Sequence, residues 1–272
     1  MNVEAYLARI GYEGRLEPTL TTLQNLHRAH LFAVPYENLD IHLGQPLTLE
    51  LPQIFDKLVT QKRGGWCFEM NGLFAWALRE LGFTVTLLGA KVERTGKLPR
   101  DTPDHLTLAV TLDRIYLADV GFGDGLLEPL PLEVGRYRQG FLEYTLAHLE
   151  EHWVFQNQPY GAAPKISFTL EPYQLKDFAK MSYFLQTSPE SGFVRAVVST
   201  RFISEGYTDL RGATLRTVTG AGVEERVLES AADFDAVLRN VFGLELPRAA
   251  ELWPLVSRQH AAWLEQMREQ RR

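Results

Sequence analysis

The first part of the chain carries apolar side chains at the spacing of a helix. Leu20, Leu23 and Leu26 fall on one face, and residues 51–61 and 66–81 repeat this spacing. A glycine directly after the last of these segments stands where a left-handed C-cap residue is expected. The pattern therefore predicts a helical N-terminal part.

The pattern changes to strand-length apolar runs in the middle of the chain. Such runs lie at residues 83–92, 105–112, 114–120, 153–155, 165–170 and 194–200. Two further runs, residues 214–218 and 223–228, flank a glycine-containing turn and predict a hairpin. Helical spacing returns from Ala231 to the end of the sequence. We therefore predict an α+β protein with helices first, a β region next and a mixed C-terminal part.

The composition is that of an ordinary globular protein, with 45% hydrophobic and 23% charged residues among 272. The formal net charge of −6 offers no general attraction to nucleic acid or anionic lipid. The first residues do not resemble an export signal, and no apolar stretch reaches the roughly 18 residues that cross a bilayer. We therefore expect neither a nucleic-acid partner nor a membrane role.

The sequence contains a single cysteine, Cys67, which cannot form an internal disulfide. This fits a reducing, cytoplasmic setting and excludes thiolate-rich zinc and iron–sulfur sites. Gly64 and Gly65 permit a sharp turn before Cys67 and leave room for a substrate. Cys67 is thus expected at a helix N-terminus, where free N–H groups stabilise a thiolate or an oxyanion. The alternative interpretation is an inert, buried thiol.

A nucleophilic thiol needs a base, and that base needs an acceptor that orients it. His105 opens one apolar run, and Asp119 closes the next one. If the hairpin between them is centred near residue 112, the two side chains lie opposite each other on one face, about 5 Å apart. Asp101 and Asp104 are competing carboxylates, although their closeness to His105 in the chain hinders a face-to-face contact.

Other candidate sites are weaker. His27 and His30 could form a two-histidine metal pair, but no further ligand lies near them in the sequence. The run from Gly121 to Gly123 does not fit a dinucleotide fingerprint, and no phosphate-binding loop or HExxH motif occurs. The glycines of residues 121–123 permit close approach of a ligand, and the phenylalanine between them offers an apolar wall.

Glu37 and Arg63 form the last candidate pair. Both could be solvated. Alternatively, they form a buried arginine–carboxylate clamp that fixes the approach to Cys67. The sequence favours neither interpretation over the other.

Several motifs together resemble the arylamine N-acetyltransferases. Residues 63–71 read RGGWCFEMN, which resembles the family signature RGGxCxExN. Residues 35–39 read PYENL where the family has PFENL, and residues 119–123 read DVGFG after the His-Leu pair at residues 105–106. Residues 186–193 and 242–247 also resemble family stretches. The likeness extends from about residue 7 to about residue 255.

The resemblance implies a Cys67–His105–Asp119 triad. Acetyl-CoA would acylate the cysteine, and an arylamine, arylhydrazine or N-hydroxyarylamine would then take the acetyl group. Splitting the transfer through an enzyme thioester predicts ping-pong kinetics. Acetyl-CoA would be a co-substrate, and no metal is implied.

The resemblance also implies three domains around a triad core like that of cysteine proteases. A helical domain at residues 1–83 would carry the nucleophile. A β-barrel at residues 84–190 would carry the histidine and the aspartate. An α/β lid with C-terminal helices would follow at residues 191–272.

The family pattern assigns further residues to the two substrates. Phe122 and Tyr36 would line the acceptor pocket, and Gly121 and Gly123 would lie along the coenzyme. Tyr36 departs from the family phenylalanine and adds a hydroxyl to an aromatic pocket. The physiological acceptor, the acyl-chain preference, the contacts to the adenine and phosphates of the coenzyme, and the oligomeric state stay open.

Three alternatives share these residues. An amide synthase that releases or closes a polyketide would use the same triad with a wider pocket. A papain-like cysteine hydrolase would pass the acyl group to water instead of an amine. A small-molecule-binding protein with an inert thiol is disfavoured, because Cys67, His105 and Asp119 are all present.

Overall fold

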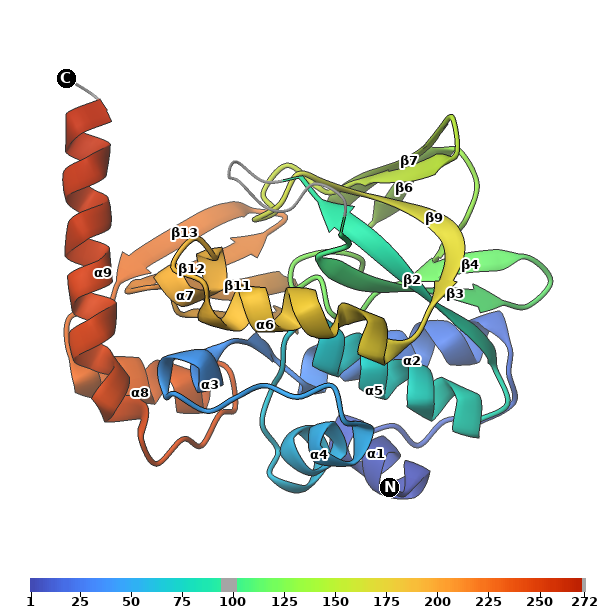
Figure 1. The fold of residues 1–272 in the computed structure, drawn as a ribbon, viewed down its shortest axis with the longest axis horizontal. Helices are drawn as coiled ribbons and strands as arrows, with labels where there is room; N and C mark the ends of the chain where they lie inside the picture. Colours follow the sequence, from blue (N-terminus) through green and yellow to red (C-terminus); the bar gives the residue numbers. More distant parts are fainter. Residues whose placement is uncertain (94–101, 271–272) are drawn as a thin grey trace.

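The computed structural model describes residues 1–93 and 102–270 (Figure 1). It confirms the α+β organisation, with helices in the first part of the chain. Thr19 begins the second helix, because its hydroxyl accepts the Thr22 N–H at 3.2 Å. The helical segments are α1 (Val3–Ile10), α2 (Leu20–Ala33), α3 (Leu39–His42), α4 (Leu51–Phe55), a π-helical turn (Asp56–Thr60) and α5 (Cys67–Glu80).

Helix α5 lies at the centre of the N-terminal part. All its residues from Cys67 to Leu78 are buried, and it packs against α1, α4 and the strands β2 (Thr84–Val92) and β3 (His105–Thr111). Such burial on all sides is typical of a core helix. The predicted left-handed residue is confirmed after its end, where Gly82 has φ 86°.

The β region forms one antiparallel sheet of eight strands in the order β5-β4-β3-β2-β9-β8-β7-β6. The sheet curls into a nearly closed, barrel-like shape, with α5 and α2 beneath it in Figure 1. Beyond β2 and β3, its strands are β4 (Ile115–Ala118), β5 (Leu130–Pro131), β6 (Gly135–Gln139), β7 (Leu142–Leu149), β8 (His152–Gln156) and β9 (Lys165–Tyr173).

The hairpin of β3 and β4 differs from the prediction in its register. Thr111 pairs with Ile115, so the turn is centred on residue 113 and not on residue 112. Every partner therefore shifts by two positions, and the direct pairing of His105 with Asp119 is wrong. A shift of two keeps each side chain on its face, because side chains alternate with a period of two. The expected common face is thus retained.

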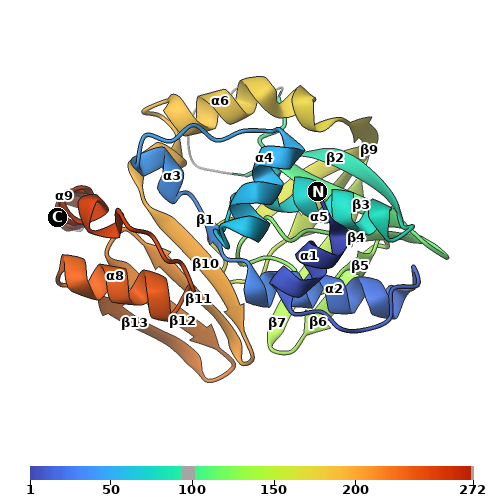
Figure 2. The same ribbon diagram turned by 90° about the horizontal axis from the view of Figure 1, so that it is seen from below.

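A second sheet of five strands joins the C-terminal part to the N-terminal part. Its order is β1-β10-β11-β12-β13, and β1 (Tyr36–Glu37) comes from the loop after α2. Figure 2 shows this sheet beside the helical cluster, with α8 (Ala231–Asn240) and α9 (Ala249–Gln270) on its outer side. The other strands are β10 (Val198–Ile203), β11 (Gly206–Arg211), β12 (Thr214–Thr219) and β13 (Gly222–Val227). The predicted hairpin is confirmed as β12 and β13.

Two predictions between the sheets need correction. The run at residues 194–200 begins as helix α7 (Gly192–Arg195), and the strand starts only at Val198. The Ser191 hydroxyl accepts the Phe193 N–H at 3.2 Å and so begins this turn. The spacing also gave no sign of the 3₁₀ turn (Leu175–Phe178) and of α6 (Ala179–Thr187), which cross from one sheet to the other.

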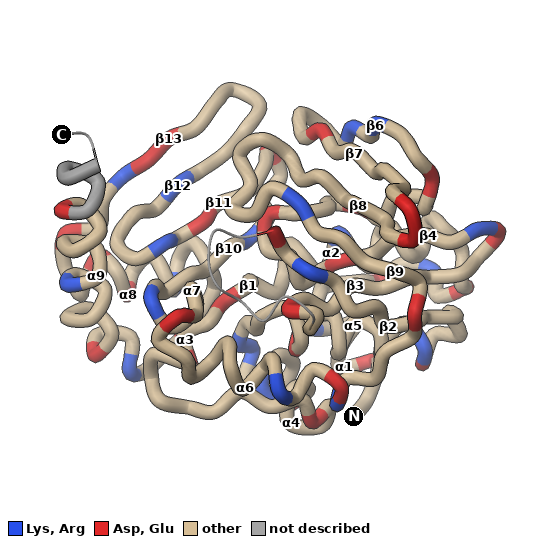
Figure 3. The backbone as a smooth tube through the Cα atoms, turned by 45° about the horizontal axis from the view of Figure 1, so that its top comes forward, with Lys and Arg blue, Asp and Glu red and all other residues tan. Residues whose placement is uncertain are grey.

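In the view of Figure 3, acidic and basic residues are interspersed along most of the elements. Among the residues that the structure describes, no helix has the length and apolar character needed to span a membrane.

Candidate active site

Cys67 is the first residue of α5. Two residues on, a Glu69 carboxylate oxygen accepts the Trp66 backbone N–H at 3.2 Å and thereby caps the start of the helix. The Cys67 side chain is 2% exposed and lines a cavity together with His105. The positive end of the helix dipole therefore lies at the sulfur, where it favours an anion.

His105 and Asp119 meet although they are not direct strand partners. Asp119 lies one residue beyond the end of β4, and its Oδ2 is 2.6 Å from Nε2 of His105. The imidazole also forms a hydrogen bond with Cys67. Because Nε2 faces the carboxylate, Nδ1 is the ring nitrogen left for the sulfur. The structure thus brings the three predicted residues together.

The surroundings favour an imidazolium between the carboxylate and the thiol. Burial alone lowers the pKa of His105, but Asp119 and the contact with Cys67 raise it to about 10. Burial also raises the pKa of Asp119, yet His105 and the donors Asn71 and Thr107 hold it below its usual range. At neutral pH the pair is therefore charged, and a protonated His105 stabilises a thiolate at Cys67.

The sulfur opens into a cavity of about 850 Å³. This volume is within the range of small-molecule sites. All three parts of the chain supply its walls: Tyr36 and Cys67 come from the first, Phe122 from the loop after β4, and Phe193 and Thr200 from the C-terminal part. A substrate held there would be in contact with both sheets.

Comparison with known proteins agrees with this geometry. A model of the N-acetyltransferase family matches residues 19–251. Arylamine N-acetyltransferase 2 of Mesocricetus auratus is 35% identical over 277 residues, which cover 91% of this chain and 96% of the relative. The chain belongs to the arylamine N-acetyltransferase family.

Further members of the family show the same likeness. The arylamine N-acetyltransferase of Mycolicibacterium smegmatis is 36% identical over 255 residues, covering 90% of this chain and 93% of the relative. The structure of Mycobacterium marinum arylamine N-acetyltransferase in complex with CoA superposes with a TM-score of 0.83 at 33% identity, covering 89% of this chain and 92% of that one. The fold and the acyltransferase class of this chain are therefore those of the arylamine N-acetyltransferases.

Asn71 is a site residue that sequence reasoning missed. Its Nδ2 donates to Asp119 Oδ1 at 2.8 Å and to the Leu106 carbonyl at 2.6 Å, while its Oδ1 accepts the Val120 N–H at 2.9 Å. The available signal was its spacing, because residues four apart on a helix share a face and Asn71 follows Cys67 by four. Asn71 thus couples the helix of the nucleophile to the loop of the aspartate.

Gly121 has a steric role that the sequence did not indicate. A Cβ at this position would meet Cys67 Cα at 2.7 Å and the Cys67 carbonyl oxygen at 2.9 Å. The loop after β4 can therefore lie against the start of α5 only if residue 121 is glycine. Gly123 is required for another reason, because its backbone has a left-handed φ of 82° that favours glycine. Both glycines line the cavity.

The two predicted acceptor-pocket residues lie in the cavity wall. Phe122 makes an edge contact with the His105 ring, with ring centres 5.2 Å apart. Tyr36 lies in β1 and comes from the opposite side, where it pairs with Thr200 of the five-stranded sheet. The cavity at the sulfur thus has one aromatic residue from the loop after β4 and one from the five-stranded sheet.

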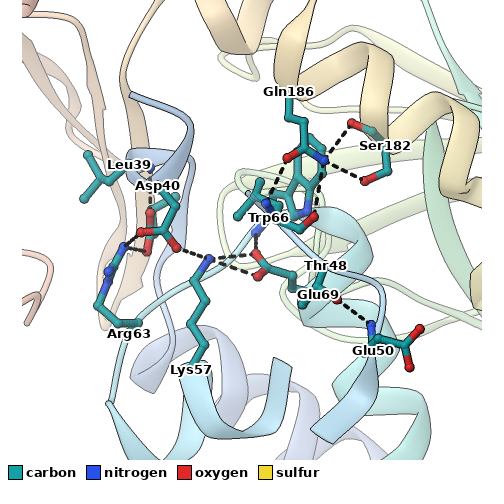
Figure 4. Close-up of polar contacts among 12 residues, drawn as sticks. Leu39, Asp40, Thr48, Glu50, Lys57, Arg63, Trp66, Glu69, Ser182 and Gln186 are labelled. Carbon is teal, nitrogen blue, oxygen red and sulfur yellow. Dashed lines mark hydrogen bonds and ion pairs between the residues drawn. The ribbon is translucent and has the colours of Figure 1, made fainter. Parts of the chain in front are cut away.

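Glu37 and Arg63 form the buried clamp, as one of the two interpretations predicts. Arg63 Nη2 lies 2.8 Å from Glu37 Oε1 and 2.8 Å from Asp40 Oδ1. Lys57 Nζ extends the network, at 2.8 Å from Asp40 Oδ2 and 2.9 Å from Glu69 Oε1 (Figure 4). Because Glu69 caps α5, this chain of charges ties the PYENL loop to the start of the nucleophile's helix.

The expectation that Gly64 and Gly65 leave room for a substrate is wrong. Neither lines the described cavity. A Cβ on Gly64 would meet the Pro35 carbonyl oxygen at 2.2 Å, and one on Gly65 would meet Glu69 Oε2 at 2.9 Å. The pair instead lets the segment before Cys67 pack against the PYENL loop and the capping glutamate.

The two histidines considered as a metal pair have other partners. His27 contacts the backbone of Asp119 and Leu127, and His30 Nδ1 lies 2.8 Å from the Tyr6 hydroxyl. Within residues 1–93 and 102–270, no cluster of three or more histidine, cysteine or acidic side chains is arranged to hold a metal ion.

The competing carboxylate Asp104 does not replace Asp119. Asp104 Oδ1 accepts the Val92 N–H at 2.7 Å and so has a structural partner. Asp101 lies outside the described residues.

Asp124 lines the cavity and was not revealed by the sequence. It is buried, and its carboxylate accepts the Ala162 N–H at 2.6 Å and the Asn157 amide at 3.2 Å. Burial raises its pKa to about 6. Since Ala162 also lines the cavity, Asp124 fixes one wall of it.

Proposed function

We propose that this chain transfers an acetyl group from acetyl-CoA to small arylamines, arylhydrazines or N-hydroxyarylamines through a thioester on Cys67. One observation carries the proposal: the contact of Cys67 with a His105 ring that Asp119 holds at 2.6 Å, at the wall of a cavity of about 850 Å³. The names of the relatives supply the chemical class of the acceptor.

The first half-reaction acylates the enzyme. The Cys67 thiolate attacks the thioester carbonyl, a bond forms between its sulfur and the carbonyl carbon, and the bond to the coenzyme sulfur breaks. The departing coenzyme thiolate takes the proton that His105 holds. Backbone N–H groups at the start of α5 are available to the oxyanion of the tetrahedral intermediate.

The second half-reaction releases the acetyl group to the acceptor. His105 is now neutral and takes a proton from the attacking amine nitrogen, which forms the amide bond. The bond from the acetyl carbon to the Cys67 sulfur breaks, and the thiolate and imidazolium are restored. Two easier steps thus replace one direct transfer.

The substrate contacts are assigned as follows. Phe122 and Tyr36 provide aromatic walls for the acceptor ring, and Gly121 and Gly123 offer bare backbone to the pantetheine arm. The supporting observation is that all four line the same cavity as Cys67. Its aromatic walls also keep water from the thioester.

The division into a helical domain (residues 1–83), a barrel-like domain (84–190) and an α/β lid (191–272) belongs to the same proposal. The distribution of the two sheets along the chain supports it, although β1 crosses to the lid's sheet. A cytoplasmic location and small-molecule partners complete the proposal, supported by the lone cysteine and the net charge of −6.

Initial-rate kinetics test this function. Rates measured against acetyl-CoA at several fixed arylamine concentrations should give the parallel double-reciprocal lines of a ping-pong mechanism, with acetylated arylamine as the product. Cys67→Ala serves as the inactive control. Acetate release that needs no arylamine would instead indicate the hydrolase, and acylation only by bulky acyl donors would indicate the amide synthase.

A further inference from the structure

His27 is a fully buried histidine on α2 that lies between two ends of one loop. Its Nε2 is 3.1 Å from the backbone nitrogen of Asp119, and its Nδ1 is 3.0 Å from the carbonyl oxygen of Leu127. The intervening residues include Phe122 and Asp124, both of which line the cavity. One ring therefore holds both ends of the segment that forms a cavity wall.

The partners determine which nitrogen carries the proton. A backbone N–H can only donate and a carbonyl can only accept, so Nε2 must be bare and Nδ1 must be protonated. This single neutral tautomer satisfies both partners, whereas a protonated ring would set two N–H groups against each other. Burial, the main cause, lowers the pKa of His27 to about 4, so the ring stays neutral at neutral pH.

Among the described residues, the backbone N–H of Asp119 donates its hydrogen bond to Nε2 of His27. It lies beyond the end of β4, where its N–H has no ladder partner, and its side chain is 3% exposed. A buried N–H without an acceptor costs about 1–3 kcal/mol. The loop would shift to satisfy it, and the carboxylate on the same residue would shift with it.

We infer that His27 is a positioning residue for the reaction: its bare Nε2 fixes the backbone of Asp119 so that the carboxylate meets His105. This inference rests on the proposed function, in which Asp119 orients the base. His27 is not among the residues that line the described cavity. It acts on the thiolate only through Asp119 and then His105.

His30 offers a matched comparison within the same helix. It is equally buried, lies almost one turn away, and also contacts the Phe74 ring edge-on, at 5.6 Å against 5.7 Å for His27. Its hydrogen bond goes to the Tyr6 hydroxyl and not to the loop. A variant at His30 therefore disturbs the packing of α2 without removing a bond to Asp119.

Two amide substitutions separate the two bonds of His27. Glutamine carries its oxygen at the ε position and can accept the Asp119 N–H. Asparagine carries its amide at the δ position, so it can donate to the Leu127 carbonyl but does not reach the Asp119 N–H. The readout is the rate of Cys67 alkylation by iodoacetamide at about pH 6 relative to about pH 9, which reports the thiolate without any acetyl donor.

We expect His27→Asn to lower this ratio, and the rate of acetylation by acetyl-CoA, by about 10- to 100-fold, with the acceptor KM unchanged. His27→Gln should stay within a few-fold of the wild type, and His30→Asn should leave the ratio unchanged. Equal ratios in all variants, or equal losses in His27→Gln and His27→Asn, would overturn the inference. A wild-type enzyme that alkylates normally but never acetylates would instead count against the proposed function.

A measurement on the wild-type protein covers the case in which a variant does not fold. Nitrogen NMR of the histidine rings should show the His27 tautomer with Nδ1 protonated and Nε2 bare across neutral pH. A ring protonated at Nε2 cannot accept the Asp119 N–H and would overturn the inference directly.

Discussion

At the scale of single residues, the chemistry depends on where one proton resides. The pKa of His105, about 10, and the lowered pKa of Asp119 keep the ring protonated and the carboxylate charged at neutral pH. Asp119 Oδ1 also accepts the Asn71 amide and the Gly121 N–H, at 2.8 Å and 2.9 Å. The carboxylate thus has fixed donors on both oxygens, and it presents one orientation to the imidazole.

Replacing Asp119 by asparagine tests this residue-scale account. The amide is uncharged and cannot stabilise the imidazolium, so the thiolate at Cys67 is less populated. We expect the acetylation rate to fall by about 10²- to 10⁴-fold while the KM for the acceptor changes little. Rapid-quench measurement of enzyme acetylation gives the rate, and unchanged turnover would show that another group orients His105.

At the scale of elements, the site is a contact between the start of α5 and the loop after β4. Asn71 joins the two through hydrogen bonds, and Gly121 lets them approach. On the far side, Glu69 caps the same helix start and pairs with Lys57, which also pairs with Asp40. Arg63 then joins Asp40 to Glu37 of the PYENL loop. The position of the sulfur is therefore set by neighbours on two sides.

Gly121→Ala probes the closeness of this contact. The new methyl would lie 2.7 Å from Cys67 Cα and 2.8 Å from Asn71 Nδ2, and the first of these is backbone that cannot move aside cheaply. We expect a loss of stability of about 1–3 kcal/mol and an acetylation rate lower by at least about tenfold. Gly220→Ala is the control, because this exposed turn glycine has no left-handed φ and an added Cβ would make only ordinary contacts, the nearest at 3.6 Å. Wild-type acetylation in a fully folded Gly121→Ala protein would contradict the account.

The sequence was informative about some elements and silent about others. Helical spacing and strand-length runs predicted the order of the elements, and the motif around Cys67 predicted the nucleophile. The roles of Asn71 and His27 depend on loops that return from 49 and 92 residues away, which no local pattern encodes. The register error at the β3–β4 turn had no consequence, because a shift of two preserves the face.

At the scale of the whole molecule, the cavity exists because the two sheets are connected around it. Asp124 anchors the segment that carries Gln158, whose Nε2 donates to the Asp124 carbonyl and to the Tyr207 hydroxyl, each at 3.1 Å. Tyr207 lies in β11 of the five-stranded sheet. A buried polar network thus bridges the barrel-like sheet and the C-terminal sheet beside the site.

This bridge gives a pH-dependent contribution to stability. Burial raises the pKa of Asp124 from 3.8 to about 6, so the folded protein binds its proton more tightly than the unfolded chain. That contribution is complete below about pH 3.8 and is lost as the pH rises through about 6. Between acid and neutral pH, the free energy of unfolding of the wild type should therefore fall by up to about 3 kcal/mol relative to that of Asp124→Asn.

Urea unfolding of the wild type and of Asp124→Asn at about pH 4.5 and pH 7.5 measures most of this difference, about 2 kcal/mol. The variant is the non-titrating control for every other ionisable group. Parallel stability profiles for the two proteins would contradict a raised pKa at this carboxyl.

Intact-mass spectrometry of the protein mixed with acetyl-CoA in the absence of acceptor tests the central claim most directly. We predict one acetyl adduct per chain, located by peptide mapping to Cys67, absent in Cys67→Ala and discharged when an arylamine is added. A protein that forms no adduct at neutral pH, or that carries the acetyl group on another residue, would contradict the claim that the thiolate of Cys67 is the nucleophile.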